Sequence, residues 1–214
     1  ISMRFLLHPA RAVAFGFLVA ILAGTLLLML PVSHAAAESG SLLVSFFTAV
    51  SAVCVTGLVI VDTGTYWSMF GQMVILFLCQ IGGFGMMTAA TLLGLMVNRS
   101  LRLRTKLVTQ VETHSLGLGD IGSVAKLVFV VTVVVEVITA VFLTTRFYSA
   151  YPMSFADAAW NGVFHAISAF NNAGFSIYPD SLMRFAVDPL ILLPIMVAIM
   201  VSGVYVGFGS HSRV

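Results

Sequence analysis

Charged residues are scarce in this sequence of 214 residues. Asp, Glu, Lys and Arg make up only 8% of it, whereas 60% is hydrophobic and the mean hydropathy is +1.08. Soluble domains typically carry about 25% charged residues, so a water-soluble domain is excluded and we expect an integral membrane protein. The net charge of +2 is too small to suggest a nucleic-acid partner.

Side chains for catalysis or metal binding are also few. The two cysteines, Cys54 and Cys79, lie in apolar segments, so we predict two small buried hydrophobes rather than a disulfide or metal cluster. The apolar stretches contain no aspartate pair and no serine near a base, so we do not expect an enzyme or a bound cofactor. The histidines have no metal-ligand spacing, and they are His8, His34, His114, His165 and His211. We assign His165 a structural role.

Four apolar runs are long enough to cross a membrane. A helix rises about 1.5 Å per residue and the hydrocarbon core is about 30 Å thick, so a span needs about 20 residues. The first run is longer than a signal-peptide core, and we expect it to be retained. Pro194 predicts that the last span is kinked or incomplete. The four predicted spans are residues 12–30, 69–97, 124–145 and 190–209.

Two further apolar segments, residues 42–53 and 155–170, are too short to cross. Ser154 and Asp157 have the spacing of a capping box, which predicts a helix start. Segments of this length occur as re-entrant, interfacial or buried helices. We favour re-entrant helices, because each segment lies between two full spans in the same order, followed by a loop that ends in glycine.

An internal repeat supports this order. The twelve residues 47–58 recur without gaps, in altered form, 117 positions later as residues 164–175. The five identical pairs are Phe47 and Phe164, Ala49 and Ala166, Ser51 and Ser168, Ala52 and Ala169, and Gly57 and Gly174. The sequence therefore predicts a first span, pore-loop, span repeat over residues 1–97, a cytoplasmic linker over 98–121, and a truncated second repeat over 122–214.

The charged residues lie unevenly about the predicted spans. Seven of the ten basic residues flank one side: Arg4, Arg11, Arg99, Arg102, Arg104, Lys106 and Lys126. Because Lys and Arg stay on the cytoplasmic side, we place the N-terminus and the linker there. The other side carries Glu38, Asp62, Asp157, Asp180 and Asp188, with Arg146 and Arg184. These acids are either a cation-concentrating surface or ordinary solvated loop residues.

The loops after the two short helices are the candidate site. Stacked backbone carbonyls can replace the hydration shell of an ion. Irregular backbone is tolerated at membrane depth where it lines an aqueous cavity or is buried in protein. Gly57 and Gly174 are natural hinges for such a turn. The predicted ion-binding residues are Cys54, Val55, Thr56, Gly57, Leu58, Asn171, Asn172, Ala173, Gly174 and Phe175.

The residues around these loops have two possible roles. The C-terminal ends of the short helices carry partial negative charge, which favours a cation. The side chains of Thr56, Asn171 and Asn172 either contact the ion or hold the loop backbone from behind, and we favour the second role. We predict the same supporting role for Ser51 and Ser168.

Two further features lie inside the predicted spans. Glu136 is an intramembrane carboxylate and hence a functional candidate, although we favour a protonated or polar-paired group packed between helices. Lys126 is about 15 Å away along the helix, too far for a direct partner. Gly82, Gly83 and Gly85 predict either a flexible bend or close helix packing.

Three motifs together resemble a known family. Thr56-Gly57-Leu58 after a Ser-Ala pair, Gln80-Ile-Gly-Gly-Phe-Gly85, and Asn171-Asn-Ala-Gly-Phe175 are similar to the Trk/Ktr/HKT superfamily of potassium-translocating subunits, closest to its bacterial Ktr/Trk type. The resemblance implies that Gly57 and Gly174 are filter glycines. A serine at the first position accompanies sodium transport in plant members, so Gly57 points to K⁺. The resemblance also implies a cytoplasmic, ring-forming, nucleotide-binding regulatory subunit.

The family has four repeats around one pore, whereas this sequence contains two. We therefore expect either the N-terminal half of a longer protein, which we favour, or assembly of two copies, and we list a homodimer among the expected partners. The predicted function is K⁺ uptake across a bacterial inner membrane, with Na⁺ as a possible coupling or activating ion. The alternatives are a secondary transporter with its substrate at broken helices, or a sodium-selective member of the same family.

Overall fold

The computed structural model describes residues 9–36, 40–106 and 118–208, with side chains for 14–36, 40–88 and 126–204, and the regular elements of this part are helices joined by loops. The elements in chain order are α1 (Pro9–Leu28), η2 (Pro31–Ser33), α2 (Leu42–Val53), α3 (Thr63–Tyr66), α4 (Met69–Lys106), α5 (Leu118–Ala150), α6 (Phe155–Phe170), η3 (Met183–Phe185) and α7 (Pro189–Phe208). Extended pairing within these residues is confined to one bridge between His34 and Trp67.

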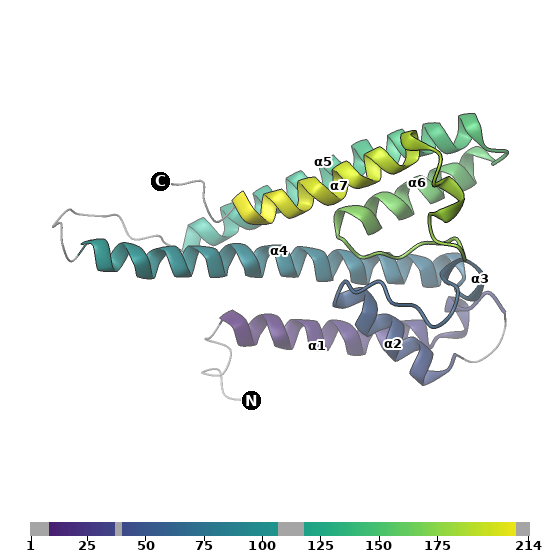
Figure 1. Ribbon diagram of the computed structural model, residues 1–214. Helices are drawn as coiled ribbons and strands as arrows, with labels where there is room; N and C mark the ends of the chain where they lie inside the picture. The colour runs from purple at the N-terminus through teal and green to yellow at the C-terminus, as the bar shows by residue number, and fades with distance from the viewer. Residues whose placement is uncertain (1–8, 37–39, 107–117, 209–214) are drawn as a thin grey trace.

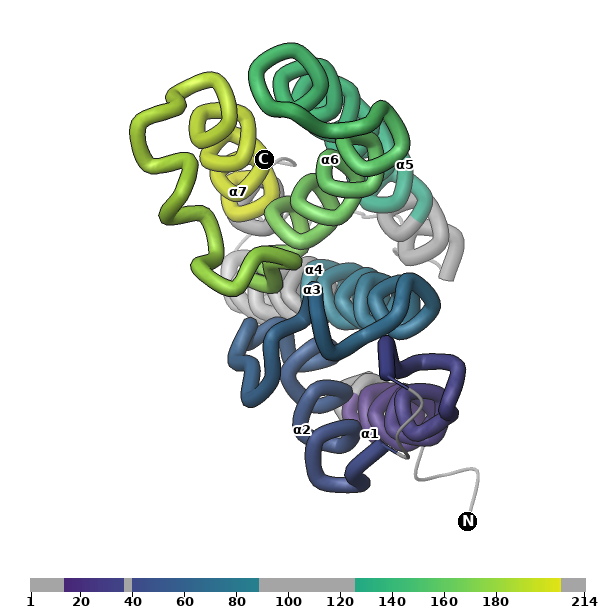
Figure 2. The backbone as a smooth tube through the Cα atoms, turned by 90° about the vertical axis from the view of Figure 1, so that its right-hand side faces the viewer, coloured from purple at the N-terminus to yellow at the C-terminus, as the bar shows by residue number. Residues whose placement is uncertain are grey.

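The helices form two groups that meet on α4 (Figures 1 and 2). On one side α4 contacts α1 and α2, and on the other it contacts α5, α6 and α7. The long helices α1, α4, α5 and α7 run along the length of the molecule, and the short helices α2 and α6 lie beside them at one end (Figure 1). The expected order of long helix, short helix, loop and long helix is therefore present twice.

Two stretches with described side chains are long and apolar enough to cross a membrane by length and composition. They are Met69–Thr88 in α4 and Lys126–Ala150 in α5. The described apolar parts of α1 and α7, Ala14–Leu28 and Pro189–Val204, are shorter. The prediction of an all-helical fold is confirmed for the described residues, and the two apolar helices are consistent with the predicted membrane protein.

The predicted boundaries agree best for the short helices, because α2 and α6 begin and end at the predicted residues. Helix α4 runs on to Lys106, beyond the predicted end at residue 97, and α5 starts at Leu118. Both ends of the predicted linker are therefore helical, and residues 107–117 lie outside the described part of the chain. Pro194 lies inside α7, which continues on both sides of it.

The start of α6 follows from its first residues. Ser154 is the N-cap, and its hydroxyl oxygen accepts a hydrogen bond from the Asp157 backbone N–H at 3.1 Å. The same hydroxyl donates to the Asp157 carboxylate at 2.7 Å. An N-cap satisfies one of the unpaired N–H groups of a first turn. The predicted capping interaction is confirmed and fixes where the short helix begins.

Buried side chains join the two groups of helices. A cluster built on α1, α2 and α4, with the fully buried Trp67 and Ile75, also contains Phe164 of α6 and Phe175 of the following loop. A second cluster with Phe147 at its centre packs α5, α6 and α7 together. Inside a bilayer, close packing rather than water exclusion drives such contacts. The shared cluster therefore fixes the loop after α6 against the first group.

Candidate functional site: the loops after α2 and α6

Each short helix is followed by a loop that reverses direction. Helices α2 and α6 both begin near the end of the molecule that carries α3, and both following loops return toward that end (Figure 1). This path of descending helix and returning irregular chain is the geometry expected of a re-entrant segment. The predicted ion-binding residues lie at the start of the two returning loops.

Both helices end in the same backbone hydrogen-bond pattern. After α2, the N–H groups of Cys54, Val55 and Thr56 donate to the carbonyls of Val50, Ala52 and Ser51, at 2.8, 3.2 and 3.0 Å. After α6, the N–H groups of Asn171, Asn172 and Ala173 donate to Ile167, Ala169 and Ser168, at 3.1, 3.0 and 2.8 Å. This is a Schellman-type helix end. The weak sequence repeat is thus a close repeat of backbone structure.

Left-handed backbone angles recur at matched positions in the two loops. Val55 and Asn172 have φ of 55° and 54°, and Gly57 and Gly174 have φ of 69° and 73°. Glycine adopts such angles freely and asparagine adopts them more readily than most residues, but a β-branched residue is strained there. Val55 is therefore a point of backbone strain, and strain of this kind clusters at functional sites.

The two loops touch at their glycines. A β-carbon placed on Gly57 would lie 2.5 Å from the carbonyl oxygen of Ala173 and 3.0 Å from the Cα of Gly174. A β-carbon on Gly174 would meet the Cα of Gly57 at 3.4 Å. The structure thus brings together two predicted filter residues that are far apart in the sequence.

The two predicted supporting serines are buried and bond to the loops. The Ser168 hydroxyl donates to the carbonyl oxygen of Phe175 at 2.7 Å. The Thr56 hydroxyl donates to the Ser51 hydroxyl at 3.0 Å. These bonds tie each loop to the last turns of its own helix. This is the position that a supporting role requires.

The asparagine side chains are engaged with neighbouring helices. Asn171 is 3% exposed, and its amide donates to Gln80 of α4 at 2.9 Å and to Glu136 of α5 at 3.0 Å. The Asn172 amide donates to the Ser202 hydroxyl of α7 at 2.7 Å. Both contacts favour the role of holding the backbone over that of contacting an ion.

Glu136 is polar-paired, as we favoured from the sequence. It is 9% exposed and accepts the hydrogen bond from Asn171, while Gln80 also hydrogen-bonds to it. Gln80 and Ser202 were missed as site residues. The sequence gives no periodic signal that would place either one beside a given loop.

The glycines of α4 permit close packing. A β-carbon on Gly82 would overlap the carbonyl oxygen of Val53 at the end of α2, and one on Gly83 would overlap the Asn171 side chain at the end of α6. The one on Gly85 would lie 2.5 Å from the ring of Phe17 in α1. Helix α4 continues through all three residues. Close packing, rather than a bend, is therefore their role, and adjacent glycines receive the ends of both short helices.

His165 has the structural role that we predicted. It is buried, its Nδ1 lies 2.8 Å from the Asn161 carbonyl oxygen, and its Nε2 lies 3.1 Å from the Ser176 hydroxyl. Because a carbonyl only accepts, Nδ1 carries a proton and donates to Asn161. The ring also stacks on Tyr178. His165 thus joins α6 to the returning part of its loop.

The residues of the two loops are exposed to different extents. The exposed predicted residues are Cys54, Thr56, Leu58, Asn172 and Gly174, and the buried ones are Asn171, Ala173 and Phe175. The prediction that both cysteines are buried is wrong for Cys54, which is exposed, and correct for Cys79. Cys54 ends α2 at the surface, whereas Asn171 in the matched position is enclosed by α4 and α5.

The acids at the loop end of the molecule are partly neutralised. Arg146 forms an ion pair with Asp188 at 3.0 Å, and Arg184 forms one with Asp180 at 2.8 Å. Burial raises the pKa of Asp188, but hydrogen bonds from Arg146 and Tyr151 outweigh it and leave the pKa below its ordinary value. These pairs weaken the acidic, cation-concentrating surface that the sequence suggested. Glu38 lies outside the described residues.

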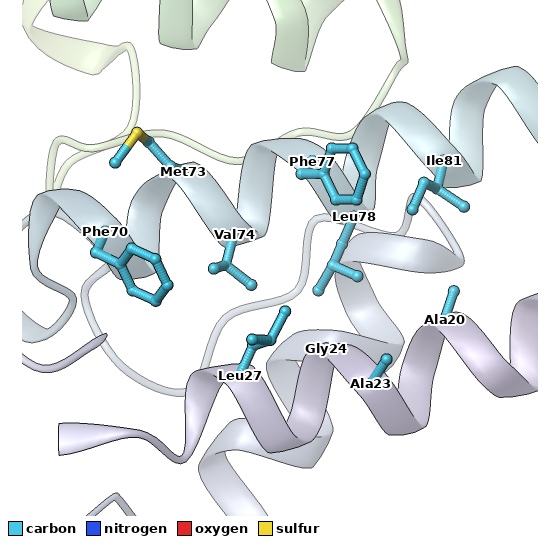
Figure 3. A pocket seen from close by; sticks show the side chains of 10 residues that line it. All are labelled: Ala20, Ala23, Gly24, Leu27, Phe70, Met73, Val74, Phe77, Leu78 and Ile81. Atoms are coloured by element: carbon cyan, nitrogen blue, oxygen red, sulfur yellow. The ribbon is translucent and has the colours of Figure 1, made fainter. Parts of the chain in front are cut away.

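Two apolar grooves lie apart from the loops. One of about 320 Å³ lies between α1 and α4 (Figure 3). Its lining residues are Ala20, Ala23, Gly24, Leu27, Phe70, Met73, Val74, Phe77, Leu78 and Ile81. A second groove of similar volume lies between α5 and α7. None of the predicted ion-binding residues lines either groove, so the grooves do not alter the choice of site.

The helical fold and the two long apolar helices among the described side chains are consistent with a membrane protein. A family model described as TrkH, cation transport protein, matches residues 10–214. The chain therefore belongs to the TrkH family of cation transport proteins, and the resemblance read from its motifs is confirmed.

Several relatives support this assignment. The chain is 39% identical over 196 residues to the Ktr system potassium uptake protein B of Bacillus subtilis (strain 168), covering 92% of this chain and 43% of the relative. It is 34% identical over 200 residues to the potassium/sodium uptake protein NtpJ of Enterococcus hirae, with the same coverage. It is 35% identical over 181 residues to the Ktr system potassium uptake protein B of Vibrio alginolyticus, covering 85% of this chain and 39% of the relative. The chain thus spans about two fifths of the length of these relatives.

Proposed function

We propose that this chain forms part of a K⁺ uptake pathway across a membrane, with the loops at residues 54–58 and 171–175 as two walls of a selectivity filter. The observation that carries the proposal is the contact between Gly57 and Gly174 at the start of two loops with the same backbone pattern. A filter needs several carbonyl-bearing segments at one point, and these two segments meet.

The backbone of the loops suits a cation. The chain is irregular from Val55 onward and is held from behind by Ser51 and Ser168. The Phe175 carbonyl accepts the Ser168 hydroxyl, and the carbonyls that precede it in the loop can serve as ligands that need no membrane-buried charge. The C-terminal ends of α2 and α6 lie beside the same point and add partial negative charge. An anion would be disfavoured there.

Potassium is the ion that the comparisons favour, since relatives are named potassium uptake proteins. One relative is named a potassium/sodium uptake protein, so Na⁺ as a coupling or activating ion, or as the transported ion, is the second candidate. A secondary transporter would place polar ligands in the loops, but the amides of Asn171 and Asn172 bond to neighbouring helices.

Assembly and location extend the proposal. Two loops surround an ion only partly, so we propose that further filter segments complete the pore, either from the same polypeptide or from a second copy in a homodimer. Following the family resemblance, we also propose a cytoplasmic nucleotide-binding ring subunit as partner. We place the protein in the bacterial inner membrane with its N-terminus in the cytoplasm.

The test is ion uptake in bacteria that lack their own K⁺ uptake systems, expressing the gene that encodes this chain. Gly57→Ser and Gly174→Ser should each lower the preference for K⁺ over Na⁺, because both remove a left-handed glycine from the proposed filter. Gly203→Ala is the control, since nothing lies within 4 Å of the added carbon. Unchanged selectivity and rate in both serine variants would refute the filter assignment.

A further inference from the structure

The buried polar contact between α4, α5 and the second loop has no place in the carbonyl mechanism. Asn171 of the loop, Gln80 of α4 and Glu136 of α5 meet there, and we call these three residues the polar clamp. Hydrogen bonds between buried polar groups restrain the segments that they join, because breaking one leaves a polar group unpaired in a medium of low dielectric constant. The question is what the polar clamp holds in place.

The amide nitrogen of Asn171 makes three hydrogen bonds, two of them within the polar clamp. It donates to Gln80 at 2.9 Å, to Glu136 at 3.0 Å and to the Ile167 carbonyl at 2.9 Å. A side-chain amide has two hydrogens, so one of them is shared between two acceptors. The side chain of Asn171 is therefore fixed from three directions.

Fixing this side chain also fixes the loop. Asn171 is the C-cap of α6, and the next residue, Asn172, has the left-handed backbone angle that turns the chain into the loop. Its carbonyl oxygen Oδ1 is buried beside Gly83, where a β-carbon would overlap it. Any shift of Asn171 would move the start of the proposed filter segment.

The first loop is held differently. There the Thr56 hydroxyl bonds to Ser51 within the loop itself. In the second loop Ala173 occupies the position that matches Thr56 and has no hydroxyl to offer. Its own helix still holds this loop through the bond from the Ser168 hydroxyl to the Phe175 carbonyl, and Asn171 adds bonds to two other helices. The polar clamp thus gives the start of the second loop an anchor outside its own helix, which the bond between Thr56 and Ser51 does not give the first loop.

We propose that Glu136 and Gln80 are positioning residues for selectivity, acting through Asn171 on the backbone of residues 171–175. This inference rests on the proposed function of these residues as a K⁺ filter. Discrimination between K⁺ and Na⁺ depends on the number and arrangement of carbonyl ligands. Loosening the clamp therefore weakens discrimination before it abolishes transport.

The experiment compares the preference for K⁺ over Na⁺, from the two KM values, in bacteria without other K⁺ uptake systems. Glu136→Leu removes the acceptor that Asn171 and Gln80 share and should lower the preference by about tenfold, the effect of losing a buried hydrogen bond. Glu136→Gln keeps an acceptor oxygen and should stay within about twofold of the unaltered protein. Gln80→Leu removes a second acceptor of Asn171, and its preference for K⁺ over Na⁺ should lie between those of the two Glu136 variants.

Thr132→Val is the matched control. Thr132 lies one turn before Glu136 on α5, is also buried, and donates its hydroxyl bond to Val128 of its own helix at 2.8 Å. The Thr132→Val variant loses a buried polar group on the same helix as Glu136, but this group has no bond to the second loop. The preference for K⁺ over Na⁺ should therefore not change. Membrane abundance of every variant is measured by immunoblot.

The outcomes separate this inference from the proposed function. If the serine variants of Gly57 and Gly174 change selectivity but Glu136→Leu and Gln80→Leu do not, the positioning role fails while the filter stands. If Glu136→Gln loses as much preference as Glu136→Leu, charge rather than hydrogen bonding is at work and the proposal fails. If both leucine variants are missing from the membrane while Glu136→Gln is normal, the clamp serves folding and the proposal is also overturned.

Discussion

The loop after α2 and the loop after α6 share one backbone path but are held by different means. The first contains a strained residue, Val55, and an internal hydroxyl bond from Thr56 to Ser51. The second has the more tolerant Asn172 at the left-handed position, and Asn171 bonds to two other helices. A repeated backbone therefore does not require repeated side chains, provided that each copy finds some restraint.

The difference has a consequence for how the loops respond to change. The first loop depends on its own residues and on α2, whereas the second depends on Ser168 of its own helix and also on how α4 and α5 are placed. Helix α4 serves both loops, because Gly82 receives the end of α2 and Gly83 receives Asn171. We therefore expect substitutions within one loop to disturb that loop alone, and substitutions that displace α4 to disturb both loops.

The largest effect is expected from replacing the contacting glycines with alanine. Gly57→Ala would combine a left-handed φ of 69° with a β-carbon 2.5 Å from the Ala173 carbonyl oxygen. Gly174→Ala carries similar backbone strain, at φ 73°, but its nearest contact is an ordinary 3.4 Å. The left-handed angle alone costs about 1–2 kcal/mol at either position, so Gly57→Ala, with its additional close contact, should reduce K⁺ uptake more than Gly174→Ala. Equal uptake by the two variants would contradict the difference in contact.

A somewhat smaller effect is expected from alanine at Gly82 and Gly83. The added carbon at Gly82 meets backbone of the first half, and at Gly83 it meets the Asn171 side chain of the second. Overpacking of this kind costs about 1–3 kcal/mol, and Gly82→Ala should cost more because backbone yields less. The unfolding temperatures of the Gly82→Ala and Gly83→Ala variants, measured in detergent, give the two losses of stability.

The control for the α4 variants is Gly203→Ala on α7, where nothing lies within 4 Å. Alanine favours a helix over glycine by up to about 1 kcal/mol. This variant should therefore unfold at the same or a higher temperature. A loss of stability at Gly203 equal to that at Gly82 would show that steric contact with the first loop is not the cause.

The third effect isolates the left-handed turn of the second loop. Asn172→Val and Asn172→Gly both lose the bond to Ser202, but only valine is strained at φ 54°. Valine should therefore be less stable than glycine by about 1–2 kcal/mol in thermal unfolding. Equal stability of the two variants would mean that a β-branched residue is tolerated here, and Val55 would then not be strained either.

The sequence alone predicted the fold well where local chemistry decides it. Helix α6 starts where Ser154 and Asp157 indicated, and α2 and α6 end where the repeat turns to small polar residues and glycine. The family followed from motifs around Gly57, Gln80 and Gly174. These features depend on neighbours in the chain, so a single sequence contains them.

Features that depend on packing between distant segments could not be predicted. Cys54 lies in an apolar run, and only the placement of α4 and α5 leaves it exposed while its counterpart Asn171 is buried. The partners of Glu136 come from residues 35 and 56 positions away in the chain, and no periodicity links them. Helix α4 continues to Lys106, beyond the end of the apolar run at residue 97. The hydrogen bonds of a helix are made within its own backbone, so polar residues can extend the helix past an apolar segment.

The smallest effect concerns the outer ends of the two halves. In the second half, Asp188 joins α7 to α5 through Arg146 and Tyr151. In the first half, Asp62 caps α3 and bonds locally to Thr65. The pKa of Asp188 is lower in the folded protein than in the unfolded chain. Its ionised carboxylate therefore stabilises the fold fully at any pH above the pKa of the unfolded chain. This stabilisation is lost as the pH falls through the lower pKa of the folded protein.

Acidification below the ordinary aspartate pKa of 3.8 should therefore release the outer end of the second half. Asp188→Asn removes the titrating group, so its unfolding temperature should start lower at neutral pH and fall less between pH 5 and about pH 2. Asp62→Asn is the matched variant in the first half, where no arginine pairs with the carboxylate among the described side chains. A fall in unfolding temperature that is the same in the unaltered protein and in Asp188→Asn would show that the ion pair does not join α5 to α7 in solution.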